Sequence, residues 1–152
     1  MKIGIISDTH GLLRPQAIAA LQGVDHILHA GDVGDDNILE ALRKIAPVTA
    51  IRGNTDHHGL CGTLPETEVV ELAGRLVYLV HSIHDLDLNP VAAGIAAVIS
   101  GHTHNPAVEH RQGVLYLNPG SAGPRRFSLP TTLATLDLTE ATLSPTLIDL
   151  LA

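Results

Sequence analysis

The chain has 152 residues, a length that fits one domain, and 45% of them are hydrophobic, which is enough for a buried core. Nine Lys and Arg residues against sixteen Asp and Glu give a net charge of −7, which disfavours generic binding to nucleic acid or to an anionic membrane. The single cysteine, Cys61, excludes an internal disulfide bond. Two features are unusual: there are ten histidines, and the aromatic residues are limited to two Tyr and one Phe.

No segment has the pattern of a membrane span or a signal peptide. The longest apolar stretch, residues 91–99, is far below the roughly 18 residues that a transmembrane helix needs. The N-terminal apolar run is too short for a signal peptide and ends at Asp8. We therefore expect a soluble, cytoplasmic protein that forms a single domain over residues 1–152.

The first third of the chain alternates strand and helix patterns. Pro15 begins a helix, Gly23 lies beyond its end, and Pro47 terminates a second helix with apolar residues at helical spacing. The predicted elements are strand 2–7, helix 15–21, strand 26–30, helix 37–45 and strand 48–51. This β-α-β-α-β order predicts parallel strands joined by right-handed crossovers.

Hairpin patterns dominate the rest of the chain, with turns at Ala73-Gly74 and Gln112-Gly113. The predicted elements are strands 68–72 and 76–80, a helical turn capped at 89–90, strand 97–100, strands 107–110 and 114–117, and a final pair at 131–138 and 142–150. We expect two packed sheets with helices outside them.

Polar residues follow five of the predicted strands at the point where each strand ends. They lie in the segments Ser7-Asp8-Thr9-His10-Gly11, Gly31-Asp32-Val33-Gly34-Asp35, Gly53-Asn54-Thr55-Asp56, His81, and Gly101-His102-Thr103-His104. In open α/β sheets, ligands bind beyond the carboxyl ends of the strands. The sequence therefore predicts a site at this edge.

The residue types in these segments select the chemistry. Two carboxylates, four imidazoles and one amide oxygen suit a divalent transition metal better than calcium. Seven ligands are too many for one tetrahedral ion, but they suit two ions that share a bridging carboxylate. Such pairs, about 3.5–4 Å apart, hydrolyse phosphate esters.

The ordered set Asp8-x-His10, Gly31-Asp32-x-x-Asp35, Gly53-Asn54, His81 and Gly101-His102-x-His104 resembles the calcineurin-like metallophosphoesterase superfamily. The short length, and Asn118-Pro119-Gly120-Ser121 followed by Pro124-Arg125, resemble its small YfcE-like phosphodiesterase branch. The resemblance implies an α/β fold, a four-layer α/β/β/α sandwich of two mixed sheets.

The resemblance also implies the roles of individual residues. The first ion would be held by Asp8, His10 and His104, the second by Asn54, His81 and His102, and Asp32 would bridge both. Catalysis would involve Asn54, Asp32 and His102, and the substrate phosphate would contact Asn54 and Arg125. A metal-bridging hydroxide would attack a phosphodiester in line. Manganese is the first choice of metal, with iron, nickel, cobalt, zinc or magnesium as alternatives.

Two positions depart from the family pattern. Thr55 stands where many members have a histidine that protonates the leaving group, and a Thr hydroxyl is far too weak an acid for this role. His57, His58 and His84 are candidates to replace it. Ser82 stands where the family often has glycine.

Several neighbouring polar residues have structural interpretations. We expect Asp35 to cap the second helix. For Asp56, formation of a turn and orientation of a metal-binding histidine are equally supported. For His29, support of the site and a purely structural role as a hydrogen-bonded histidine at a strand end are equally supported. Loop exposure is the favoured interpretation of His57 and His58.

Two alternatives remain open beside the phosphodiesterase with its small diester substrate. One is a phosphomonoesterase or nucleotide hydrolase on the same fold, and the other is a non-catalytic binding module similar to Vps29. Homo-oligomers are compatible with the sequence. Because aromatic residues are scarce, we expect little selectivity among nucleobases.

Overall fold

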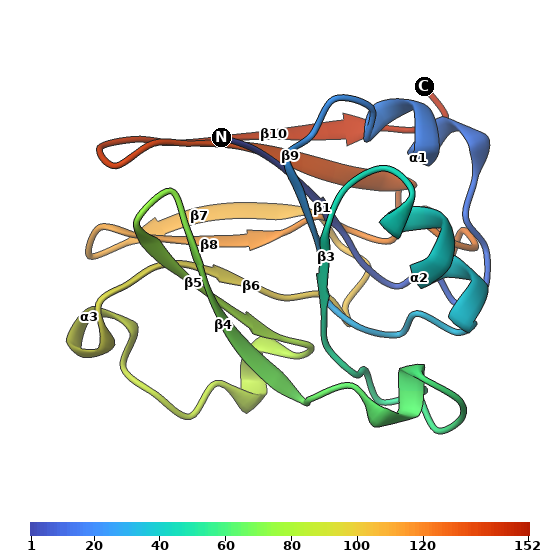
Figure 1. Cartoon of the computed structure of the whole chain (residues 1–152), viewed down its shortest axis with the longest axis horizontal. Coiled ribbons are helices and arrows are strands. Elements are labelled where there is room, and N and C mark those ends of the chain that lie inside the picture. The colour runs from blue at the N-terminus through green and yellow to red at the C-terminus, as the bar shows by residue number, and fades with distance from the viewer.

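The structure, a computed structural model, describes residues 1–152 and contains two five-stranded β-sheets (Figure 1). The first sheet has the order β10-β9-β1-β2-β3. Its strands are β1 (Lys2–Ile6), β2 (His26–His29), β3 (Val48–Ala50), β9 (Thr132–Leu138) and β10 (Leu143–Asp149). As predicted, β1, β2 and β3 run parallel, whereas β9 and β10 pair antiparallel.

The second sheet has the order β4-β5-β6-β8-β7 and is also mixed. Its strands are β4 (Thr67–Leu72), β5 (Arg75–Val80), β6 (Ile95–Ile99), β7 (Ala107–Arg111) and β8 (Val114–Asn118). The strands β5, β6 and β8 run parallel, and β4 and β7 are antiparallel edge strands. Both expected hairpins are therefore present.

Short helices complete the four layers. Two of them, α1 (Pro15–Ala20) and α2 (Asp36–Arg43), pack on the first sheet, and α3 (Pro90–Ala93) packs on the second. Asp35 accepts a hydrogen bond from the Asn37 amide and caps α2, as predicted. The sequence did not predict the single 3₁₀ turns Cys61–Thr63 and Ile83–Asp85, because three residues carry no periodicity.

Three clusters of buried side chains separate the layers. The central one, between the sheets, contains only Ile, Leu, Val and Ala, including Ile5, Leu28, Leu79 and Ile99. A second cluster fills the space between the first sheet and α1 and α2, and a smaller one covers the outer face of the second sheet. The central cluster therefore contains no aromatic residue, and Tyr78 in the smaller outer cluster is the one aromatic side chain that is buried.

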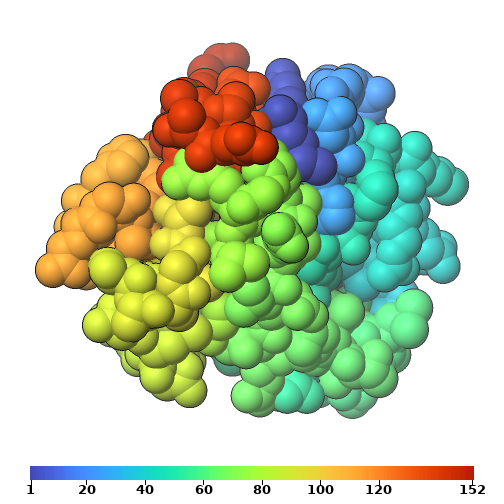
Figure 2. Space-filling model, turned by 60° about the vertical axis from the view of Figure 1, so that its left-hand side comes forward, coloured from blue at the N-terminus to red at the C-terminus, as the bar shows by residue number.

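Two further observations concern the whole chain. Figure 2 shows the red C-terminal segment beside the dark blue N-terminal strand, in agreement with the pairing of β9 with β1. None of the helices is both long and apolar enough to cross a membrane.

The central core predicts a clear contrast between two substitutions. Leu79→Ala, at a fully buried position between the sheets, should lower the free energy of unfolding by about 3 kcal/mol, because it leaves a cavity. Val69→Ala, on edge strand β4 with 44% of its surface exposed, should cost less than about 1 kcal/mol. Denaturant titration measures both values, and equal costs would contradict the assigned core.

Candidate metal centre

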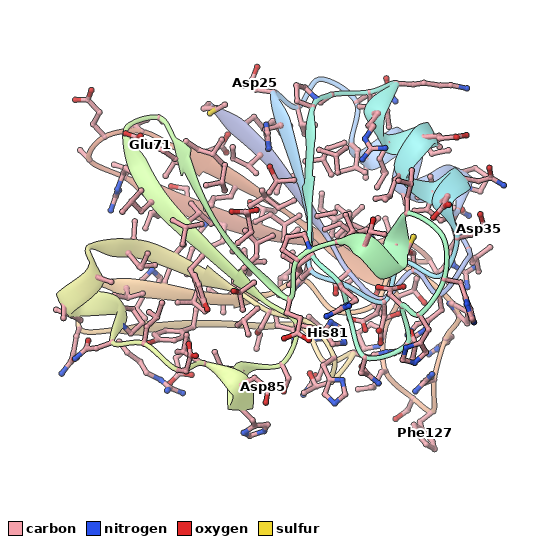
Figure 3. All side chains as sticks on the ribbon, turned by 60° about the horizontal axis from the view of Figure 1, so that its bottom comes forward. Asp25, Asp35, Glu71, His81, Asp85 and Phe127 are labelled. Atoms are coloured by element: carbon pink, nitrogen blue, oxygen red, sulfur yellow. The ribbon has the colours of Figure 1, made fainter.

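Loops from both sheets converge at one edge of the structure. The strands β1, β2 and β3 of the first sheet and β5 and β6 of the second each end at this edge, and their following loops carry the polar residues. Figure 3 shows His81, which directly follows β5, near the centre of this edge. The structure thus brings together all seven side chains that the sequence singled out, as their distances show.

Six of these side chains form two compact groups. In each group, the candidate ligand atoms lie within 4.8 Å of one another. The first group is Asp8, His10 and His104, and the second is Asp32, His81 and His102. These groups match the two predicted ligand sets, except that Asp32 completes the second group.

Asp32 lies between the two groups. Its Oδ2 atom is 3.2 Å from Nε2 of His81 in the second group and 3.7 Å from Nε2 of His10 in the first. Its other oxygen, Oδ1, accepts a hydrogen bond from the Thr55 amide and is fixed by it. One carboxylate oxygen is therefore available to both groups at once, which is the arrangement expected of a bridging ligand.

Asn54, the seventh residue, joins the second group. Its Oδ1 atom lies 3.0 Å from His81 Nε2 and 3.1 Å from His102 Nδ1. His81 Nδ1 must donate to the Ala30 carbonyl oxygen, 2.7 Å away, since a carbonyl only accepts. In a neutral His81, Nε2 therefore carries the free lone pair and faces Asp32 and Asn54, as a metal ligand would.

Asp8 provides a test of whether a cation fits here. Its Oδ2 atom accepts hydrogen bonds from the Ser7 hydroxyl and the His102 amide. Its Oδ1 atom is buried without a hydrogen-bond partner and lies 3.4 Å from His104 Nε2. An unsatisfied buried acceptor costs about 1–3 kcal/mol, and a cation held by the first group would remove this cost. The donor set therefore fits a divalent metal.

The environment keeps both carboxylates ionised. Burial opposes the charge of Asp32, but interactions with His81 and the Thr55 backbone outweigh it and hold the pKa of this carboxyl far below its ordinary value. Burial of Asp8 is likewise outweighed by the His104 and Ser7 side chains, so its pKa is also lowered. Both groups carry negative charge at neutral pH, which attracts cations.

The backbone at these ligands is strained. Left-handed φ values between 45° and 72° occur at five of the seven residues, namely Asp8, His10, Asp32, His102 and His104. Such conformations cost on the order of 1–3 kcal/mol each outside glycine and persist where the surroundings enforce them. The fold holds these side chains at the expense of local backbone stability.

Two glycines allow the loops to approach each other. A Cβ atom on Gly53 would overlap the Asp32 carboxylate and its backbone nitrogen, and one on Gly101 would overlap Ser7 Oγ. The close approach of the loops after β2 and β3, and after β1 and β6, therefore requires glycine at these positions.

Asp56 and His29 support the loops from behind. The Asp56 carboxylate accepts from the amides of Val33, Gly34 and Gly53, so it braces the backbone and orients no histidine. The Gly31 amide donates to His29 Nδ1, which leaves Nε2–H to donate to the Thr9 hydroxyl. His29 is thus a fully buried, neutral histidine that joins two of the converging loops.

Other candidates lie farther out. Arg125 is exposed, and its Nε donates to the Leu129 carbonyl within its own loop, so its contact with substrate stays a prediction. Its neighbour Arg126 lies close enough to His10 to lower the pKa of that histidine, an effect secondary to burial. His57, His58 and His84 are all exposed, and His57 also lines a hollow of about 340 Å³ together with Asn54.

A larger hollow of about 590 Å³ lies beside Asn54, His81 and His102, and the other residues of its walls were not predicted from the sequence. These walls include Arg52, Glu66, Asp85 and Asp87. Of these four residues, only Arg52 could have been predicted from the sequence to lie near the site, because it directly precedes the Gly53-Asn54 pair.

Known proteins resemble this chain in sequence and in fold. A model of the calcineurin-like phosphoesterase superfamily domain matches residues 1–141. A probable metallophosphoesterase of Methanocaldococcus jannaschii is 37% identical over 160 aligned positions, which cover 95% of this chain and 81% of that protein.

Two solved structures have a similar fold. An archaeal phosphodiesterase matches with a TM-score of 0.80 and 25% identity, over 97% of this chain and 100% of that chain. Vps29 of Entamoeba histolytica, solved with zinc, matches with a TM-score of 0.74 and 20% identity, over 99% of each chain. The second likeness concerns the fold alone. Together these findings confirm the resemblance and the four-layer sandwich inferred from the sequence.

The buried His29 predicts a pH dependence of stability. Burial lowers its pKa to about 4 from 6.5, so below pH 6.5 the unfolded chain binds a proton that the folded chain does not. The stabilisation of the folded state by neutral His29 is fully present above pH 6.5 and is lost as the pH falls through 4. The free energy of unfolding decreases by about 3 kcal/mol over this range. Denaturant titrations of the metal-free protein should show that the free energy of unfolding falls less steeply with decreasing pH for His29→Gln than for the wild type.

The control for this measurement is His110→Gln, at an exposed position on β7. It should leave the wild-type pH profile between pH 6.5 and 4 unchanged. A His29→Gln profile that coincides with the wild type would show that folding does not lower the pKa of His29.

Proposed function

The chain belongs to the calcineurin-like phosphoesterase superfamily, and we propose that it hydrolyses phosphodiester bonds with two divalent metal ions. The observation that carries this proposal is the position of Asp32, whose Oδ2 lies within 3.7 Å of a histidine from each group. A pair of ions requires a ligand shared in this way.

Seven side chains would hold the ions. The first ion would be bound by Asp8, His10 and His104, the second by Asn54, His81 and His102, and Asp32 would contact both. When bound, the ions would make a water molecule nucleophilic at neutral pH and would neutralise charge on the substrate phosphate. Nitrogen and carboxylate ligands favour manganese, iron, cobalt, nickel or zinc, and manganese is our first choice.

The protein's own groups orient the substrate. Asn54 Oδ1 faces His81 and His102, so the amide nitrogen of Asn54 retains two N–H groups that can donate to a phosphate oxygen. The 590 Å³ hollow beside these residues gives the phosphate access. We place Arg125 as a second phosphate contact, because only its Nε is engaged within its loop.

Support for a diester substrate comes from the position after Asn54. Thr55 cannot protonate a leaving group, and the small phosphodiesterase branch, which the chain resembles, often lacks the histidine at this position as well. The archaeal phosphodiesterase that matches over the whole chain is consistent with the same substrate class. The presence of all seven ligand residues favours an enzyme over a non-catalytic module, although the Vps29 structure has a similar fold.

Removal of the shared ligand tests the proposal. Asp32→Asn should lower kcat/KM for bis-p-nitrophenyl phosphate by at least about a hundredfold, since a neutral amide cannot bridge two cations. Asp35→Asn is the matched control, because Asp35 caps α2 and asparagine is an equally good cap. Full activity of a folded Asp32→Asn protein would contradict the proposed centre.

A second prediction concerns the leaving group. His57 lines the smaller hollow with Asn54, so we propose that it supplies the proton that Thr55 cannot. His57→Gln should slow hydrolysis of alkyl diesters roughly a hundredfold and leave bis-p-nitrophenyl phosphate, whose leaving group needs no proton, unchanged. His58→Gln is the control, because the neighbouring His58 does not line this hollow. Equal effects on both substrates would exclude His57 as the proton donor.

A further inference from the structure

The hollow of about 590 Å³ is continuous with the second ligand group. Asn54, His81 and His102 form part of its wall, and the remainder comes from their chain neighbours and from two other segments, at residues 66–67 and 85–87. Any phosphodiester bound at Asn54 has two ester groups, and this hollow, the larger of the two that Asn54 lines, has room for one of them.

The walls of the hollow are polar and acidic. Val80 is the only apolar residue among them, and they contain the carboxylates of Glu66, Asp85 and Asp87 but only one guanidinium, that of Arg52. Arg52 Nη2 donates to Glu66 Oε1 over 2.7 Å, so these two charges neutralise each other. Figure 3 shows Asp85 on the short turn that follows His81.

Asp85 and Asp87 have no such partner. Both are exposed, and neither takes part in any ion pair of the structure. No ion pair of the protein therefore neutralises their two negative charges in the wall of the hollow. A second phosphate on the substrate would be repelled there, whereas a cationic group would be attracted.

Recognition of an aromatic group has no support at this position. Tyr78 is buried, Tyr116 packs under the Arg111 guanidinium, and neither lines the hollow. Phe127 is 95% exposed and also lies outside its walls. Charge is therefore the property by which this hollow can distinguish substrates.

We propose that Asp85 and Asp87 select phosphodiesters whose second ester group carries a fixed positive charge, such as the phosphodiesters of amino alcohols. This selection rests on the proposed phosphodiesterase activity and specifies its substrate class. With Val80 as the single apolar wall residue, the hollow offers nothing to an acyl chain, so the substrate is a water-soluble diester and not a lipid.

Two chromogenic esters of the same shape isolate the effect of charge. The choline ester of p-nitrophenyl phosphate carries a trimethylammonium group, and the 3,3-dimethylbutyl ester replaces it with a neutral isostere. At low ionic strength, kcat/KM for the manganese-loaded enzyme should be about three- to tenfold higher for the choline ester. Added salt should reduce this ratio, because the two carboxylates are exposed.

In the variant Asp85→Asn/Asp87→Asn, the ratio of kcat/KM for the choline ester to kcat/KM for the neutral ester should be close to one. Its bound metal content should equal that of the wild type. The control Asp137→Asn/Asp149→Asn removes the same charge from β9 and β10 and should keep the wild-type ratio. A ratio near one in the wild type, or one that the first variant leaves unchanged, would overturn the selection by charge.

A failure of the proposed activity gives a different result, since the wild type would then hydrolyse neither ester. A separate assay tests whether the substrate with the cationic group is a soluble diester or a membrane lipid. Glycerophosphocholine should be hydrolysed, and phosphatidylcholine in vesicles should not. Faster cleavage of the vesicle lipid than of the soluble diester would contradict a water-soluble substrate.

Discussion

Two buried carboxylates with one free oxygen each are the constraint on which the rest of this structure depends. Asp8 and Asp32 each use one oxygen in hydrogen bonds with neighbouring loops and turn the other toward histidines. Ionised groups in such surroundings need a counter-charge, and Asp8 Oδ1 has no hydrogen-bond donor at all. Divalent cations would provide that charge. The strained loops, the close glycines and the neutral His29 can all be understood as means of holding these two side chains in place.

The sheets explain why this cluster can form. Parallel strands deliver the residues at their carboxyl ends to one edge, and packing of the two sheets through an aliphatic core brings their edges together. The backbone conformation of the ligands is unfavourable on its own, so the packed core must supply the stability that the loops lack. The division between a well-packed core and a strained edge is typical of proteins whose loops carry function.

Most of this architecture could be predicted from the sequence. The apolar runs and the hairpin turns gave the strands, Pro15 and Asp35 marked helix starts, and the polar residues after five strands gave the candidate site. The prediction failed where contacts between distant segments decide the result. Nothing in the local sequence shows that Asp56 would brace three backbone amides, or that Asp85 and Asp87 would face the same hollow as Asn54. The contact of Arg125 with a phosphate, which its motif suggests, stays a prediction, since its one hydrogen bond within its own loop leaves its other N–H groups without a protein partner.

The central claim is that the chain binds two divalent ions through one shared carboxylate. The most direct test is the metal stoichiometry of the folded protein, measured by native mass spectrometry after metal removal and titration with manganese. The account predicts successive binding of two ions per chain in the wild type and loss of the two-ion species in Asp32→Ala. A wild-type protein that binds one ion or none at saturating manganese, or an Asp32→Ala protein that still binds two, would contradict it.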